Sequence, residues 1–399
     1  MTEYNDLGHM QPVLKSTQPH PFCYIPHHGV YKESSSTTKL RVVFNASRKY
    51  SSGVSLNDCL HTGPKLQSDL ASLLLKWRLH RVAFMADIEK CFRQIIVSDE
   101  DADMQRIFWR NTEGEPQIFR LRTVTYGLNC SPYLTIKVLL TLAKEEEARF
   151  PHASKILRES FYMDDCLHGA DNVAEAVSLR NELQELVQCG GFTLRKWNSN
   201  SLDFLHEINS DICTSASACC NLTLDKETKA LGIFWSCASD TIGYKIALTS
   251  YTEPITKRQQ LSDVAKTYDP IGLLAPVIIV GKIIFQELWV LGCAWDDPIP
   301  SPHQQTWRKF RDELPYLESI KIDRWVYTSS KSVNYQLHVF SDASKSAYAA
   351  VCYIRVVKPE GSIHVAVLMA KTKVAPLKKI PIPRLELNAT LLAAKFALK

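Results

Sequence analysis

Two adjacent aspartates, Asp164 and Asp165, interrupt the apolar and aromatic stretch SFYMDDCLHG, and they restrict the fold more than any other feature of the chain. Neighbouring carboxylates repel each other, and loss of water disfavours their charged forms further. The stretch predicts two short β segments around a tight turn, with a cation between or beside the two carboxylates. Hard cations such as Mg²⁺ take one or two carboxylates together with phosphate oxygens.

A third aspartate, Asp87, follows the apolar run RVAFMA, which predicts a buried strand. An aspartate at the end of such a strand lies at a sheet edge, where ligands bind. Three carboxylates on neighbouring strands would complete a site for two metal ions. Two ordinary explanations stay open, because an Asp after a strand is commonly a helix N-cap and a Y-x-D-D tetrapeptide also arises by chance.

The rest of the chain mixes helical and strand patterns. Strands are expected in LRVVFNAS, PQIFRLRTVTYG, KALGIFWSC and IGYKIAL, and helices in DLASLLLKWRLH, in residues 132–149 and in NVAEAVSLRNELQELVQCG. Residues 256–294 predict a helical region with a break at PIGLLAP, and residues 295–335, rich in Pro and Trp, predict a connector. The last block predicts three strands, beginning with YQLHVFSDAS, and a final helix, RLELNATLLAAKFALK.

Composition is that of an ordinary globular protein, with 399 residues, 45% hydrophobic and 22% charged. A net charge of +5 permits an anionic partner without requiring one. The twelve cysteines form no C-x-x-C pair, which favours free thiols in a reducing compartment. The polar N-terminus and the short apolar run IGLLAPVIIVGKIIF predict neither a signal peptide nor a membrane span. We therefore expect a soluble, intracellular protein.

Several motifs stand in the order found in reverse transcriptases. YMDD at 162–165 resembles that family's signature, and DIEKCF at 87–92 is similar to its first metal motif. KLRVVFNAS, from Lys39, resembles the fingers segment that holds the incoming triphosphate. YGLNCSP, 126–132, resembles the segment that packs on the template, and GGFTLRKW, 190–197, the motif after the helix. Over nearly the whole chain, CYIPHHGV, TTKLRVVFNAS, LRKWNSN and YDPIGLLAPV are together similar to BEL/Pao-type retrotransposon polyproteins.

The resemblance implies roles for individual residues. Asp87, Asp164 and Asp165 would hold two Mg²⁺ ions, or Mn²⁺, with help from the carbonyl of Ile88. Lys196 would be a general acid toward pyrophosphate, with its neighbour Arg195 as the alternative. The implied substrate-binding residues are Lys39, Arg41, Phe92, Tyr126, Gly127, Tyr162 and Met163.

Three of these residues have both a specific and an ordinary explanation. Phe92 would be a steric gate against a ribose 2′-hydroxyl, or it is a core aromatic. Arg41 would bind triphosphate oxygens through its planar guanidinium, or it is a surface cation. Gly127 would let the backbone approach the substrate, or it is a turn glycine. Tyr126 stands where the retroviral pattern has glutamine, so the contact on the template side must differ.

A second acidic pair lies near the C-terminus. Asp342 follows an expected strand, and Glu386 is expected in the first turn of the final helix, after Pro383. The pair resembles the opening half of a ribonuclease H domain, whose remaining aspartates would lie beyond Lys399. We therefore expect ribonuclease activity to be incomplete in this chain.

The resemblance implies an α+β fold, a right-hand polymerase followed by a partial ribonuclease H-like α/β domain. The expected ranges are 1–38 for a loop-rich N-terminal segment, 39–250 for fingers and palm, 251–335 for a thumb or connection, and 336–399 for the truncated ribonuclease H-like domain.

The expected activity is RNA-directed DNA synthesis by two-metal nucleotidyl transfer from a dNTP to a primer 3′-hydroxyl. The expected partners are an RNA template, a DNA primer or RNA–DNA hybrid, and dNTPs, with no membrane and with the oligomeric state open. The expected location is the cytoplasm, with retroelement particles and the nucleus left open. Three alternatives remain: an inactive nucleic-acid-binding remnant of a retroelement, a structural or assembly protein, and a DNA-templated polymerase.

Overall fold

The computed structural model describes residues 1–13, 21–31, 40–212, 227–248, 250, 253–328 and 334–398. Contacts divide the chain into two compact units. Unit 1 comprises Met1–Ser68, Ala86–Cys166 and Leu179–Lys196, and unit 2 comprises Asp69–Met85, Leu167–Ser178 and Trp197–Lys399. Because each unit combines segments that are distant in sequence, each is held together mainly by tertiary packing.

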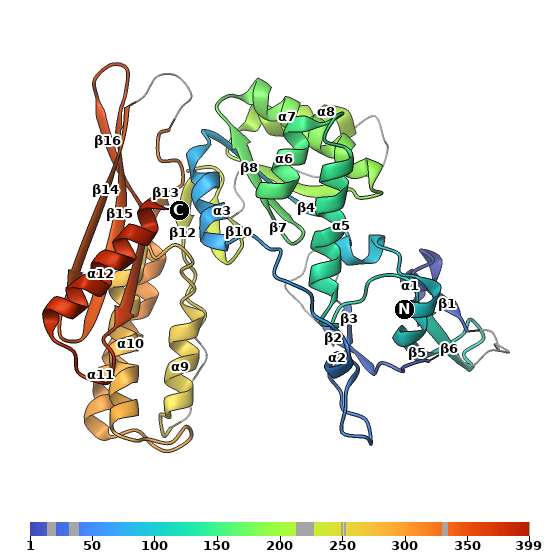
Figure 1. Cartoon of the computed structure of the whole chain (residues 1–399), viewed down its shortest axis with the longest axis horizontal. Coiled ribbons are helices and arrows are strands. Elements are labelled where there is room, and N and C mark those ends of the chain that lie inside the picture. The colour runs from blue at the N-terminus through green and yellow to red at the C-terminus, as the bar shows by residue number, and fades with distance from the viewer. Residues whose placement is uncertain are drawn as a thin grey trace. The chain divides into compact units, whose positions relative to one another are not determined.

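Unit 1 contains two small antiparallel sheets and a pair of helices (Figure 1). The first sheet has the order β1-β6-β5, from Met10–Pro12, Pro116–Leu121 and Arg106–Arg110. The second pairs β2 (His27–Tyr31) with β3 (Leu40–Phe44). Helices α5 (Ser131–Glu145) and α6 (Pro151–Glu159) pack together. The short helical elements are α1 (Thr2–Asp6), α2 (Leu56–Cys59), η1 (Cys91–Gln94), α4 (Asp99–Ala102) and η2 (Asp103–Gln105).

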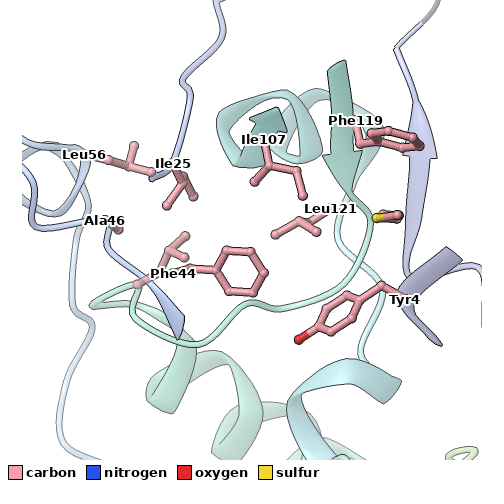
Figure 2. Close-up of a cluster of buried hydrophobic side chains, with 10 residues drawn as sticks. Tyr4, Ile25, Phe44, Ala46, Leu56, Ile107, Phe119 and Leu121 are labelled. Atoms are coloured by element: carbon pink, nitrogen blue, oxygen red, sulfur yellow. The ribbon is translucent and has the colours of Figure 1, made fainter. Parts of the chain in front are cut away.

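A cluster of buried apolar side chains joins the N-terminal segment of unit 1 to its two sheets (Figure 2). Tyr4 of α1 and Met10 of β1 are 9% and 5% exposed, and Met10 is paired with Leu121 of β6. Residues 1–38 were expected to be rich in loops, but they contain α1, β1 and β2. Pairing and burial against distant strands stabilise these short elements, whose local sequence is a weak signal.

The central sheet has the order β7-β8-β4-β9 and carries the acidic hairpin. Its strands are β7 (Phe161–Tyr162), β8 (Asp165–Ala170), β4 (Val82–Ile88) and β9 (Leu194–Ser199). Strand β4 is almost wholly buried, as its apolar run predicts. Helix α7 (Val173–Cys189) connects β8 to β9 and ends before Gly190, as its sequence predicts.

Unit 2 combines a small antiparallel sheet, a helical region and a strand–helix block. The small sheet has the order β10-β11-β12-β13, from Glu227–Ala230, Ile233–Ser236, Thr241–Gly243 and Ile322–Asp323. Helices α9 (Lys257–Lys266) and α10 (Ala275–Val290) flank the predicted break. The last block is an antiparallel sheet of β14 (Asn334–Ala343), β15 (Ala347–Val357) and β16 (Ile363–Val374), with α12 (Ile382–Ala397) packed against it (Figure 1). Helices α3 (Leu70–Leu79) and α8 (Leu202–Ile212) also belong to this unit.

Residues 295–335 are more than the predicted connector, because they contain the 13-residue helix α11 (Ser301–Glu313) and the 3₁₀ helix η3 (Leu314–Ser319). Pro300 is the N-cap of α11 and Pro302 lies in its first turn, where the missing N–H of proline leaves no hydrogen bond unmade. Trp307 is buried in a cluster with Ile284 and Leu288 of α10. The prolines therefore start a packed helix here.

Two buried arginines, Arg78 and Arg324, and Asp240 form what we call the arginine cluster of unit 2. Arg324 donates from Nε and Nη2 to the two carboxylate oxygens of Asp240, at 2.7 and 2.8 Å. Its Nη1 donates to the carbonyls of Trp77 and His80 at the end of α3. Arg78 donates to the carbonyls of Arg324, Asp323, Val367 and Leu368. The cluster thus ties α3 to β13 and β16, with charge-assisted hydrogen bonds from both guanidinium groups.

Within the described ranges, no helix is both long and apolar enough to cross a membrane. Nine cysteines in the same ranges are free thiols, as expected: Cys23, Cys59, Cys91, Cys130, Cys166, Cys189, Cys237, Cys293 and Cys352.

Candidate active site

The adjacent aspartates lie in a hairpin with a two-residue turn, as the sequence predicts. Tyr162 of β7 is paired with Asp165 of β8, which leaves Met163 and Asp164 as the turn. Met163 has φ of 58°, in the left-handed region that a side chain with a Cβ rarely adopts. Contacts that hold this turn therefore decide where both carboxylates lie.

Strand β4 brings Asp87 beside this hairpin. The backbone N–H of Ile88 donates to the carbonyl of Asp164 at 2.9 Å, so the end of β4 is bonded to the turn itself. We call Asp87, Asp164 and Asp165 the acidic cluster. On the other side of β4, Lys196 of β9 places Nζ 2.7 Å from Oδ2 of Asp87. The neighbouring Arg195 instead pairs with Glu89, also at 2.7 Å.

The acidic cluster holds more negative charge than its surroundings compensate. Burial, together with the charges of Asp164 and Asp87, raises the pKa of Asp165 to about 7, against a smaller lowering by Lys196. Burial also raises the pKa of Asp164, assisted by the charge of Asp87. Such carboxylates favour a proton or an added cation.

The donor chemistry of the acidic cluster fits a hard cation, because its groups are carboxylate oxygens. Within the described part of the chain, however, no group of three or more His, Cys, Asp and Glu side chains is arranged to hold a metal ion. Asp87 is paired with Lys196 instead. An ion shared with the hairpin would therefore either bind the Asp87 carboxylate beside Lys196 or displace the lysine from it.

Two of the predicted substrate-binding residues lie together. The rings of Phe92 and Tyr126 have centroids 4.9 Å apart, with Phe92 half-buried and Tyr126 40% exposed. Burial raises the pKa of Tyr126 to about 12, so its phenol stays protonated at neutral pH. Phe92 is therefore neither a fully buried core residue nor an isolated surface ring.

Gly127 follows Tyr126 and has φ of 92°. A Cβ at this position would overlap the carbonyl oxygen of Phe44, and Asn57 donates from Nδ2 to the Gly127 carbonyl at 2.8 Å. Close packing against the Phe44 backbone is therefore a structural reason for glycine at this position.

The basic residues predicted for the triphosphate are only partly described. Arg41 is exposed on β3, opposite Val30 of β2. Lys39 lies outside the described residues. Tyr162 and Met163, the first half of YMDD, are both half-buried.

The second acidic pair differs in detail from its prediction. Asp342 lies inside β14, one residue before its end, and is paired with Ala349 of β15. Glu386 is the fifth residue of α12, because the helix begins at Ile382, so the prediction that Glu386 lies in the first turn was wrong. Pro381 as N-cap and Pro383 in the first turn fix that earlier start.

Two residues with no sequence signal contact the site. Gln67 donates from Nε2 to the carbonyl of Phe161 at 3.0 Å and accepts from the N–H of Met163 at 2.9 Å. Asn57 bonds Gly127 and also accepts from the N–H of Asn129. Ser55 and Asp58 form the capping box of α2, so the sequence could have predicted the short helix that contains Asn57, but not its contact with Gly127.

Comparison with known proteins supports the fold. Residues 256–399 match the family described as the Pao retrotransposon-like RNaseH-like domain. No curated protein matches. Among solved structures, the foamy viral protease-reverse transcriptase dRH in complex with double-stranded DNA is similar, at 15% identity and a TM-score of 0.62, over 99% of this chain and 58% of that one.

The foamy viral protease-reverse transcriptase in complex with RNA/DNA hybrid is similar at 15% identity and a TM-score of 0.59, over 100% of this chain and 45% of that one. This chain therefore spans about half the length of these two solved structures. Its mixed fold of helices and strands is similar to that of a retroviral reverse transcriptase, and its C-terminal part is similar to a ribonuclease H-like domain of Pao retrotransposons.

Proposed function

We propose that this chain is the reverse transcriptase region of a BEL/Pao-type retrotransposon polyprotein and synthesises DNA on an RNA template. The observation that carries the proposal is the acidic cluster: three carboxylates, from a hairpin and the strand beside it, share a site with too little positive charge. An uncompensated acidic site has no structural benefit, whereas nucleotidyl transfer requires carboxylates for divalent cations. The similarity to foamy viral reverse transcriptase supports the same function.

The proposed layout assigns fingers and palm to residues 39–250, a thumb or connection to 251–335 and a ribonuclease H-like segment to 336–399. Helices α9 and α10 support the helical character of the third range, and the block of β14, β15, β16 and α12 supports the fourth. The match to the Pao family begins at residue 256 and so extends over both of these ranges.

In the proposed mechanism, Asp87, Asp164, Asp165 and the Ile88 carbonyl would hold two Mg²⁺ ions. Such a pair would supply Lewis acidity toward the primer 3′-hydroxyl and positive charge for the leaving pyrophosphate. The protein orients the substrates, which is the other large contribution to such reactions.

The remaining side chains would bind the nucleotide. Lys196 would donate a proton to the leaving pyrophosphate, because its ammonium is paired with Asp87 of the acidic cluster. The Phe92 ring, supported by Tyr126, would occupy the space of a ribose 2′-hydroxyl, and Arg41 would bind triphosphate oxygens.

Primer extension on an RNA template with Mg²⁺ tests the proposal. The wild type is expected to incorporate dNTPs, and Asp164→Asn is expected to lower the rate by about a thousandfold or more, equal to about 4 kcal/mol of lost transition-state stabilisation. Asp6→Asn, an exposed aspartate at the end of α1, is the matched control and should retain the wild-type rate. Equal extension by wild type and Asp164→Asn would exclude the role of the hairpin, and extension on DNA templates alone would favour a DNA-templated polymerase.

The second candidate function is nucleic-acid binding without catalysis. It is favoured by the pairing of Asp87 with Lys196 and by the absence, in the described ranges, of a ready group of three ligands for a metal. This candidate predicts binding of an RNA–DNA hybrid that weakens steeply with salt, with no incorporation at any Mg²⁺ or Mn²⁺ concentration.

A further inference from the structure

Among the residues that the structure describes, no strand neighbours the outer edge of the acidic hairpin. In the order β7-β8-β4-β9, strand β7 is the edge strand of the central sheet. Tyr162 is paired with Asp165 across the turn, and backbone groups of an antiparallel strand alternate in direction. The carbonyl of Phe161 and the N–H of Met163 therefore point away from β8. Such outward groups need partners other than a strand.

The side chain of Gln67 supplies both partners. Its Nε2 donates to the Phe161 carbonyl at 3.0 Å, and its Oε1 accepts from the Met163 N–H at 2.9 Å. One amide group thus replaces the donor and acceptor that a neighbouring strand would offer. Glutamine suits this position because it combines a donor and an acceptor on one group.

The surroundings of Gln67 strengthen these two hydrogen bonds. Gln67, Phe161 and Met163 line a small cavity together with Leu139 of α5 and Leu157 of α6. Gln67 is half-buried here, and hydrogen bonds become stronger where neighbouring side chains shield them from water. The bonded N–H belongs to Met163, the residue with positive φ, so Gln67 acts on the strained position of the turn.

The hairpin needs such support because it is short. Strand β7 has two residues, and an isolated hairpin of this length is at best marginally stable in water. Ile88 of β4 holds the Asp164 backbone from one side, and Gln67 holds the Met163 backbone from the other. Asp164 therefore lies between two anchored points.

We infer that Gln67 is a positioning residue, which fixes the turn that carries Asp164 and Asp165 without itself touching substrate. This inference rests on the proposed polymerase function and adds to it a residue from outside the resembling motifs. The loop before α3 would thereby determine how accurately the carboxylates are presented.

The test compares Gln67→Leu and Gln67→Glu with wild type. Gln67→Leu removes both hydrogen bonds at similar volume, and Gln67→Glu keeps an acceptor for Met163 while losing the donor to Phe161. The matched control is Gln117→Leu, which changes another half-buried glutamine of unit 1, on β6. Thermal unfolding shows whether each variant is folded. If Gln67→Leu does not fold, the comparison is made with Gln67→Glu.

Two measurements distinguish positioning from general stability. Hydrogen–deuterium exchange in peptides spanning residues 160–166, in metal-free protein, is expected to be about five- to tenfold faster in Gln67→Leu and less accelerated in Gln67→Glu. In primer extension, kcat is expected to fall by about tenfold or more and the half-maximal Mg²⁺ concentration to rise, while the KM for primer–template stays constant. Gln117→Leu should match the wild type in all of these.

Measurements on the wild type distinguish failure of the positioning role from failure of the proposed function. If wild type extends primers and Gln67→Leu keeps the wild-type exchange rate, kcat and Mg²⁺ midpoint, the inference alone is overturned. If wild type incorporates no dNTP at all, the proposed function is overturned, and the positioning role is overturned with it.

Discussion

The acidic cluster of unit 1 and the arginine cluster of unit 2 each gather three charged side chains, and they differ in how the charges are compensated. In the arginine cluster, Arg324 binds both oxygens of Asp240, and backbone carbonyls accept from the remaining guanidinium nitrogens. In the acidic cluster, three carboxylates share Lys196, and the pKa of Asp165 rises to about 7.

The difference separates a structural use of charge from a functional one. Buried charges stabilise a fold only when hydrogen bonds and counter-charges offset the loss of water, as they do around Arg324. A site that leaves charge uncompensated is less stable than it need be, and such sites are typical of binding and catalysis. Substitutions that remove charge should therefore have opposite effects on stability in the two clusters.

The largest stability effect is expected in the arginine cluster. Arg324→Met leaves the half-buried Asp240 without its cationic partner and frees the carbonyls at the end of α3, which should lower the free energy of unfolding by about 3 kcal/mol. Urea unfolding followed by tryptophan fluorescence measures the change, because Trp77 and Trp235 both pack against Arg324.

Arg258→Met is the matched control for that substitution. Arg258 pairs with Asp296 on the surface, where both side chains are exposed, and its loss should leave unfolding unchanged within error. Similar destabilisation by both substitutions would contradict the structural role of the arginine cluster.

An intermediate effect is expected from His80, whose carbonyl accepts from Arg324. Burial and the Arg324 charge lower the pKa of the His80 imidazole to about 4. Between pH 6.5 and 4, His80 is protonated in the unfolded chain but stays neutral in the folded protein. The free energy of unfolding should therefore fall by ~2 kcal/mol as the pH falls through this window. His80→Gln should remove this part of the slope in urea unfolding from pH 7 to pH 4.

His206, an exposed histidine of α8, provides the comparison for His80. His206→Gln should keep the wild-type dependence on pH. A wild-type slope that survives His80→Gln would mean that other groups cause the loss of stability in acid.

The smallest effect, and the one of opposite sign, is expected in the acidic cluster. Asp165→Asn removes a charge that burial and two neighbouring carboxylates disfavour, so it should raise the free energy of unfolding by about 1 kcal/mol at pH 8 in EDTA. The same variant should lose primer extension. If Asp165→Asn destabilised the protein as strongly as Arg324→Met, the two clusters would not differ in the way we infer.

Local pattern was enough for several of the longer elements of the chain. The buried strand β4, the hairpin of β7 and β8, helix α7 and the final block of three strands and a helix all lie where the sequence predicts. Their hydrophobic periodicity and turn residues are local signals, and in these elements the tertiary packing agrees with them. The same reasoning failed for α11 and for the start of α12, where prolines in the first turn begin a helix instead of ending one.

The sequence was sufficient to place three aspartates beside strands, in motifs that resemble those of reverse transcriptases in their order. Only the tertiary structure decided which groups surround them: Lys196 on Asp87, Gln67 on the hairpin backbone and Asp240 on Arg324. The physical reason is that such partners lie scores of residues away in sequence, and hydrogen bonds between them depend on how folded strands and loops meet. The local sequence pattern does not predict these long-range contacts.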